Sequence, residues 1–189
     1  MTDEIRSQIA EYIRTKVAAA FISPDHIRES AVAVFADECE PETLDVFAEE
    51  ETRRAIEEHL RAEMTWPAET DCDRLDAAFA DLERNGIVAR QDFSCCGTCG
   101  VADIQGEMES AGTSTRGYTF YHMQDTDSAA EGCGLYLSYG SLEEGEGPAL
   151  AVARDVVEML RKHGISAEWD GSLSHRIRVP LTWQRRYRK

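Results

Sequence analysis

The sequence predicts an α+β fold, in which a helical N-terminal region is followed by an α/β sandwich with a mixed sheet. Apolar residues before position 64 recur at helical spacing, and none of these segments alternates as a strand does. After Trp66-Pro67, short β-prone runs alternate with helical stretches, which predicts strands joined by helices. We therefore expect an acidic helical subdomain over residues 1–66 and an α+β sandwich domain over residues 67–189 that carries a cysteine cluster.

Three helical stretches are expected in the first part. The first has apolar residues four positions apart from Ile5 to Phe21. In the second, Ser23-Pro24 supplies a cap and a proline at the first helical position. The third follows Pro41, and its run Glu49-Glu50-Glu51 is a candidate break between two shorter helices. The buried side chains expected in the second and third stretches are Ile27, Ala31, Val34, Phe35, Leu44, Phe47, Ala55, Ile56, Leu60 and Met64.

The second part is expected to begin with a helix that Thr70-Asp71-Cys72-Asp73 starts as a capping box and Asn85-Gly86 ends. Helices are expected mainly on one face of the sheet. The elements that follow are a strand from Ile87 toward Phe93, a helix over 95–109, a strand over 118–123, a short helix capped by residues 124–127, a strand over 135–139, a helix over 148–163, and strands over 165–169 and 175–181 joined by a turn at Asp170-Gly171.

The charge of the chain restricts its partners. It has 36 acidic and 20 basic residues, a net charge of −16, and residues 1–92 hold 23 of the acidic and 10 of the basic ones. Such a surface repels phosphate groups, which argues against nucleic acid and anionic membranes. Residues 75–90 resemble the recognition helix and first wing strand of winged-helix transcription factors, but Asp76, Asp81 and Glu83 are negative where phosphates would be contacted. We expect an unknown protein or small-molecule partner, no nucleic acid and no membrane.

The N-terminal residues lack the basic head and apolar run of a secretory signal, and no stretch approaches the roughly 20 apolar residues of a membrane span. We therefore expect a soluble, cytoplasmic protein. In a reducing compartment, a clustered CxxC is more typical of catalysis, metal binding or redox sensing than of a structural disulfide. The basic tail over residues 185–189 is expected to be solvated and frayed.

The sharpest chemical signal is Phe93-Ser94-Cys95-Cys96-Gly97-Thr98-Cys99-Gly100, which holds three of the six cysteines. Cys96 and Cys99 form a CxxC where a strand is expected to give way to a helix, with Ser94 placed to cap it. Backbone amides at a helix start stabilise a thiolate and lower its pKa. In a thiol-disulfide oxidoreductase, Cys96 would be the attacking thiol and Cys99 the resolving one. The likeness to thioredoxin is confined to this motif, because no proline is expected to face the pair from a later strand.

Zinc binding is a second interpretation, since a CxxC supplies two ligands of a tetrahedral site. The neighbours Cys95 and Cys96 are expected to bind one ion together only with difficulty. The other two ligands would come from Cys72, Cys95, His122 and Cys133, and the favoured set is Cys96, Cys99, His122 and Cys72. A third interpretation is structural, because cysteines are small apolar residues that are often buried and Gly97 and Gly100 permit close packing.

Two further places carry candidate residues. His122 with Asp125 could provide acid/base chemistry beside the thiols, although Asp125 is also a good helix cap and His122 a half-buried strand residue. Trp169-Asp170-Gly171 with Arg176 and Arg178 could line a ligand groove. The alternative is a hairpin with its apolar residues inward and its arginines outward.

Several segments together resemble a bacterial family of proteins of unknown function, whose members have a helical N-terminus, a CCxxCG element and a terminal WDG hairpin. The resemblance covers most of the chain, most strongly from Trp66 onward. It implies a bacterial cytoplasmic setting and no particular activity or cofactor. We therefore expect a binding or regulatory protein centred on the thiol site, and whether it is an enzyme stays open. The segments are residues 70–79, 86–90, 93–100, 117–127 and 169–171.

Overall fold

The computed structural model describes residues 1–110 and 115–187, so the last two residues of the basic tail lie outside it. The chain forms two compact units, residues 1–68 with 184–189 and residues 69–183. Seven helices and a four-stranded mixed sheet are found in the described residues, which confirms the predicted α+β class. Among these helices none has the length and apolar character that crossing a membrane requires.

The helical unit consists of α1 (Asp3–Ala19), α2 (Pro24–Val34) and α3 (Pro41–Glu63). Ser23 caps α2 as predicted. The candidate break at residues 49–51 was wrong, because α3 keeps one buried face on both sides of this run. Val34 and Met64 were also predicted to be buried, but they lie at helix ends and are 59% and 85% exposed. The core of this unit is Ile9, Ile13, Val17, Ile27, Ala31, Leu44, Ala48 and Ala55.

The C-terminal segment packs on this helical unit. The Arg185 side chain lies over the ring of Phe21, 4.4 Å from its centroid, and the residue is only 9% exposed. The Tyr187 hydroxyl donates to the carbonyl of Ile22 at 3.0 Å, and the Tyr187 amide donates to Glu63 at 2.6 Å. The expectation of a frayed tail was therefore wrong for these residues, because a cation-π contact and partly buried hydrogen bonds hold them. The sequence had placed them in the second domain, whereas their contacts place them in the first unit.

The second unit is built on a sheet with strand order β1-β2-β3-β4. β1 and β2 are parallel, and the other two pairs are antiparallel. The capping box at Thr70 is confirmed. The strand predicted over 165–169 was wrong, since this segment makes only a single bridge, from Glu168 to Arg178. The elements are α4 (Asp71–Arg84), β1 (Ile87–Arg90), α5 (Gly97–Ser110), β2 (Gly117–Phe120), α6 (Met123–Ala130), β3 (Leu135–Ser141), α7 (Glu146–Lys162) and β4 (Ile177–Val179).

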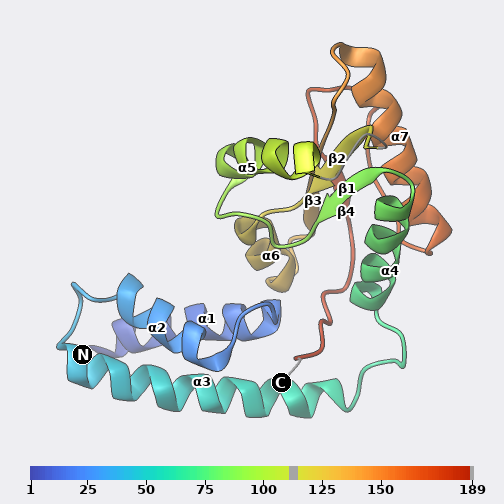
Figure 1. The fold of residues 1–189 in the computed structure, drawn as a ribbon. Helices are drawn as coiled ribbons and strands as arrows, with labels where there is room; N and C mark the ends of the chain where they lie inside the picture. Colours follow the sequence, from blue (N-terminus) through green and yellow to red (C-terminus); the bar gives the residue numbers. More distant parts are fainter. Residues whose placement is uncertain (111–114, 188–189) are drawn as a thin grey trace. The chain divides into compact units, whose positions relative to one another are not determined.

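Helices cover both faces of this sheet (Figure 1). α4 and α7 pack together, with α7 against Gly117 of β2. Successive strand residues point to opposite faces, and Val88 and Phe120 face the other way, where they pack against Ile104 and Met108 of α5. The expectation of helices mainly on one face is thus corrected by α5, the helix that begins at the cysteines.

Gly100 allows α5 to approach the sheet closely. A Cβ atom at this position would lie 2.5 Å from Cε2 and 2.8 Å from Cζ of Phe120, an aromatic ring that is fully buried. Such a ring cannot move aside without disturbing the core around it. The glycine of the CCxxCG element is therefore required for packing.

Replacing Gly100 with alanine is expected to destabilise the protein by about 1–3 kcal/mol, because the added methyl overpacks the contact with Phe120. Chemical denaturation of the two proteins measures the difference. Gly106→Ala is the matched control on the same helix, since nothing lies within 4 Å of its added Cβ. The control is expected to be neutral or to gain up to about 1 kcal/mol of helix propensity. Equal stability of the two variants would contradict the packing role of Gly100.

Candidate functional site

The pairing of β1 and β2 continues past the ends of both strands. The Tyr121 amide donates to the Arg90 carbonyl at 3.3 Å, the Phe93 amide donates to the Tyr121 carbonyl at 2.9 Å, and the Met123 amide donates to the Ser94 carbonyl at 3.2 Å. These three bonds hold the start of the segment over residues 91–97, which we call the cysteine loop, beside the start of α6. Two segments about 30 residues apart in the sequence therefore lie side by side.

The loop bends sharply between these bonds. Asp92 and Ser94 have left-handed backbones, with φ of 52° and 64°, a conformation that is costly for residues other than glycine. Ser94 was predicted to cap the helix, and this was wrong, because its hydroxyl donates instead to Asp103 at 2.8 Å. The capping position belongs to Cys96, whose carbonyl accepts the amide of Gly100 at 2.9 Å.

Three thiols converge at this helix start. The Sγ atoms of Cys95, Cys96 and Cys99, which we call the thiol cluster, all lie within 4.8 Å of one another. Cys95 and Cys99 are exposed, Cys96 is half-buried, and all three are free. From the sequence, the neighbours Cys95 and Cys96 were expected to bind one ion together only with difficulty. Their sulfurs nevertheless lie at the same place.

The thiols of the cluster differ in acidity. The backbone amide of Cys99 lowers the pKa of Cys96 most, followed by the thiols of Cys99 and Cys95 and the amide of Thr98. Hydrogen bonds from the Cys99 thiol to the sulfurs of Cys95 and Cys96, together with their negative charge, raise the pKa of Cys99 to about 11. Cys96 therefore ionises before Cys99, and the thiolate is the reactive form of cysteine.

His122 begins α6 rather than ending the preceding strand. Its Nδ1 accepts the amide of Asp125 at 3.3 Å, and its own amide donates to the Asp125 carboxylate at 3.1 Å, which makes a capping box. Because Nδ1 accepts, the ring proton is on Nε2, which lies 3.1 Å from the same carboxylate. Burial lowers the pKa of His122, and Arg176 lowers it further while Asp125 opposes the shift. The imidazole is thus neutral at pH 7, and its Nε2 lies beside a buried carboxylate and 3.5 Å from Nη1 of Arg176.

Arg176 completes this group. Its guanidinium lies 2.5 Å from the Asp125 carboxylate, donates to the Tyr136 carbonyl and covers the Tyr136 ring at 5.6 Å. In the hairpin interpretation of the sequence, Arg176 and Arg178 were both expected to point outward. That holds for Arg178, which pairs with Glu168 at the surface, but not for Arg176. A carboxylate that is only 5% exposed requires a cation, which this arginine provides. We call His122, Asp125 and Arg176 the buried polar cluster.

The two clusters meet at Gly97. A Cβ atom there would lie 3.7 Å from Cδ2 and Nε2 of His122, so the imidazole edge lies against the backbone of the cysteine loop. Nδ1 of His122 already accepts the Asp125 amide, and Nε2 lies 3.1 Å from the Asp125 carboxylate. His122 therefore packs against the loop and has no nitrogen turned toward the thiols. Cys72 is buried in α4 and only 2% exposed. Of the four predicted zinc ligands, the group found in the described residues therefore joins Cys96 and Cys99, with Cys95 as the third member.

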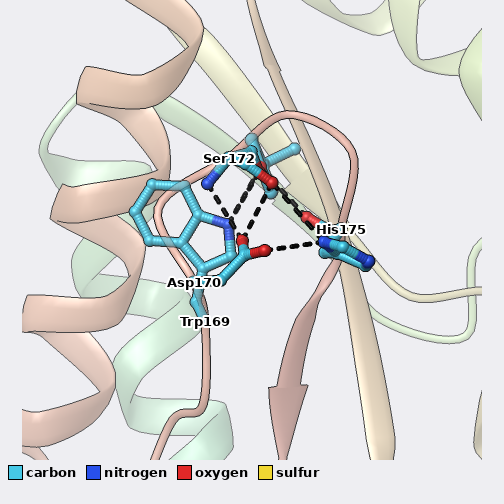
Figure 2. A network of polar contacts seen from close by, with 5 residues as sticks. Trp169, Asp170, Ser172 and His175 are labelled. Carbon is cyan, nitrogen blue, oxygen red and sulfur yellow. Dashed lines mark hydrogen bonds and ion pairs between the residues drawn. The ribbon is translucent and has the colours of Figure 1, made fainter.

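The Trp169-Asp170-Gly171 segment forms a closed loop (Figure 2). The Trp169 indole donates to the Tyr139 hydroxyl at 3.0 Å, and Asp170 accepts the Ser172 amide at 3.0 Å and faces His175 Nδ1 at 2.7 Å. Hydrogen bonds from Ser172, with His175 as a smaller cause, lower the pKa of Asp170. This loop is a local scaffold, and it ends one residue before the arginine of the buried polar cluster.

Sequence reasoning missed two parts of the site. The role of Cys96 as its own helix cap was hidden because serine is the commoner cap, and Ser94 stood two residues earlier. The pairing of Arg176 with Asp125 links positions 51 residues apart, which no local pattern reveals. One signal in the sequence could have indicated this pair. An aspartate in a capping box beside a half-buried histidine needs a positively charged partner, and Asp125 is such a residue.

These features define an α+β protein with an accessible thiol cluster at a helix start. The chain belongs to the family described as Domain of unknown function (DUF6891), which matches residues 2–187. This confirms the expected resemblance to a family of unknown function. Comparison with curated proteins and with solved structures gave no match.

Because the pKa of Cys96 is lowered and that of Cys99 is about 11, alkylation of the reduced protein is expected to modify Cys96 before Cys99. Reaction with iodoacetamide at pH 7, followed by peptide mass spectrometry, should show Cys96 modified faster than Cys99. The difference should narrow as the pH approaches 11 and Cys99 ionises. Faster alkylation of Cys99 at pH 7 would contradict the assigned order of ionisation.

Proposed function

We propose that this protein is a cytoplasmic binding or regulatory protein whose working group is a redox-active dithiol, with Cys96 as the attacking thiolate and Cys99 as the resolving thiol. The observation that carries the proposal is the convergence of the sulfurs within 4.8 Å at a helix start. Solvent access to Cys95 and Cys99 lets a second molecule reach the cluster.

The reaction is thiol-disulfide exchange with a disulfide of a partner molecule. The Cys96 thiolate attacks one sulfur of that disulfide, forming a mixed disulfide and releasing the other sulfur as a thiolate. Cys99 then loses its proton to solvent and attacks the Cys96 sulfur, which releases the second partner thiolate. Cys96 and Cys99 are left joined by a disulfide, and the partner disulfide has been reduced by two electrons.

Oxidation would change the structure around the thiols, which supports a regulatory role. The backbone amides of Cys99 and Thr98 lower the pKa of Cys96 and so favour its thiolate. A disulfide sulfur is neutral, so oxidation would remove this attraction between the thiolate and the start of α5. The same loop touches the His122 ring through Gly97, which links the redox state to the buried polar cluster.

The test is reaction of the reduced full chain with oxidised glutathione. The wild type is expected to lose two thiols and to gain a Cys96–Cys99 disulfide in its peptide map. Cys99→Ser should accumulate glutathione on Cys96, whereas Cys96→Ser should lose both products. Cys133→Ser, which removes an exposed cysteine outside the thiol cluster, is the matched control and should react as the wild type does. Unchanged reaction of Cys96→Ser would contradict the proposal.

Zinc binding is a second candidate, favoured by the third converging sulfur. Tetrahedral zinc-thiolate bonds of about 2.3 Å place sulfurs about 3.8 Å apart, which small movements of Cys95, Cys96 and Cys99 would reach. A fourth position would be open to solvent or to a partner. The Cys95→Ser variant distinguishes the two candidates when its zinc content and its reaction with glutathione are both measured. About one zinc per chain in the wild type and none in Cys95→Ser supports the zinc site. Metal-free Cys95→Ser protein that exchanges with glutathione as the wild type does supports the dithiol.

A further inference from the structure

The thiol cluster holds one more sulfur than the proposed exchange reaction uses. Cys96 and Cys99 carry out both steps of that reaction, and Cys95 takes part in neither. Neighbouring side chains point to opposite faces of a strand, yet Cys95 and Cys96 converge after the left-handed turn at Ser94, whose φ is 64°. The thiol of Cys95 is free and exposed. A third sulfur is therefore available beside the dithiol for a second function.

Three sulfurs make up the donor set at this place. Within the described part of the chain, no histidine nitrogen or carboxylate oxygen joins the ligand atoms that lie within 4.8 Å of one another. The nitrogens of His122 face Asp125, and the Asp103 carboxylate accepts the Ser94 hydroxyl at 2.8 Å. The cluster is thus a three-coordinate site whose donors are all soft thiols.

Coordination number and charge decide which ligand fits this site. Zinc in a structural site takes four protein ligands, so three sulfurs leave it incomplete. Three thiolates also repel one another, and the chain already has a net charge of −16. Trivalent arsenic binds three sulfurs in a pyramid, keeps a lone pair where a fourth ligand would stand, and cancels all three thiolate charges. It therefore matches the site both in the number of bonds and in charge.

We propose that the thiol cluster binds trivalent arsenic, taken up as arsenous acid, through the sulfurs of Cys95, Cys96 and Cys99. In each of three condensation steps an S–H bond and an As–OH bond break, an As–S bond forms, and the proton leaves with the hydroxide as water. Neither arsenic nor sulfur changes its oxidation state. This function goes beyond the proposed exchange, because it requires Cys95 and involves no disulfide.

The fold prepares the site for this reaction. The bonds between Phe93 and Tyr121 and between Ser94 and Met123 hold the cysteine loop before any ligand arrives, so binding loses less conformational freedom than it would in an open chain. Cys95 and Cys99 are exposed, which gives a small neutral molecule direct access. Three sulfurs should also hold arsenic more tightly than two, because the third bond forms within the same molecule.

The test is titration of the reduced full chain with sodium arsenite in oxygen-free buffer that contains EDTA to remove zinc, with intact-mass spectrometry and thiol counting as readouts. The wild type is expected to lose three free thiols and to gain one arsenic atom in exchange for three hydrogens. An adduct that keeps a hydroxide on arsenic would mean that only two sulfurs bind, and it would overturn the proposal. The absence of any adduct would overturn it as well.

Variants separate binding by three sulfurs from binding by the dithiol. Cys95→Ser should weaken arsenite binding roughly tenfold or more and leave a hydroxide on arsenic, because one intramolecular bond is lost. The same variant should bind phenylarsine oxide, a probe that takes two thiols, as the wild type does. Cys133→Ser removes an exposed cysteine outside the thiol cluster and is the matched control, which should bind both probes unchanged.

The outcomes distinguish this proposal from the exchange reaction. Equal arsenite binding by the wild type and Cys95→Ser would overturn the three-sulfur site and leave thiol-disulfide exchange intact. Binding of arsenic by three sulfurs in a protein that fails to react with oxidised glutathione would support the site and contradict the exchange reaction alone.

Discussion

The candidate site depends on the backbone pairing that carries β1 and β2 past their ends. The bonds of Phe93 with Tyr121 and of Ser94 with Met123 hold the cysteine loop in place, even though two left-handed residues interrupt it. This pairing fixes the residues before α5 beside the start of α6, and the packing of α5 on Phe120 adds to it. Our central claim is that the thiols are preorganised by the sheet and not by contacts among themselves.

From that constraint the chemistry of the cysteines follows. The loop places Cys96 at the start of α5, where backbone amides favour its thiolate. It also places the sulfurs of Cys95 and Cys96 close enough to Cys99 to raise the pKa of Cys99. Gly100 lets the helix lie on Phe120, so the same packing that builds the core orients the thiols. The residues that pack α5 on the sheet therefore also position the thiols. Because Gly97 lies against the His122 ring, oxidation of the thiols would change the surroundings of the buried polar cluster.

The sequence predicted what local patterns encode. The capping box at Thr70, the helix start at Pro24 and the strand-to-helix position of the CxxC rest on residues a few positions apart, where propensity and hydrogen bonding decide the structure. It did not predict that α5 covers the second face of the sheet, that Arg176 pairs with Asp125, or that Tyr187 packs on the helical unit. Each of these depends on tertiary contacts between distant segments, which a single chain read in order does not reveal.

Hydrogen exchange at the amides of Phe93 and Met123 tests the central claim most directly, because both amides bond across the loop and not within a named strand. The account predicts that they exchange as slowly as the amides shared between β1 and β2, in wild type and in Cys96→Ser alike. Exchange as fast as in an unstructured peptide, or protection that disappears when the thiol is removed, would show that the sheet does not hold the site.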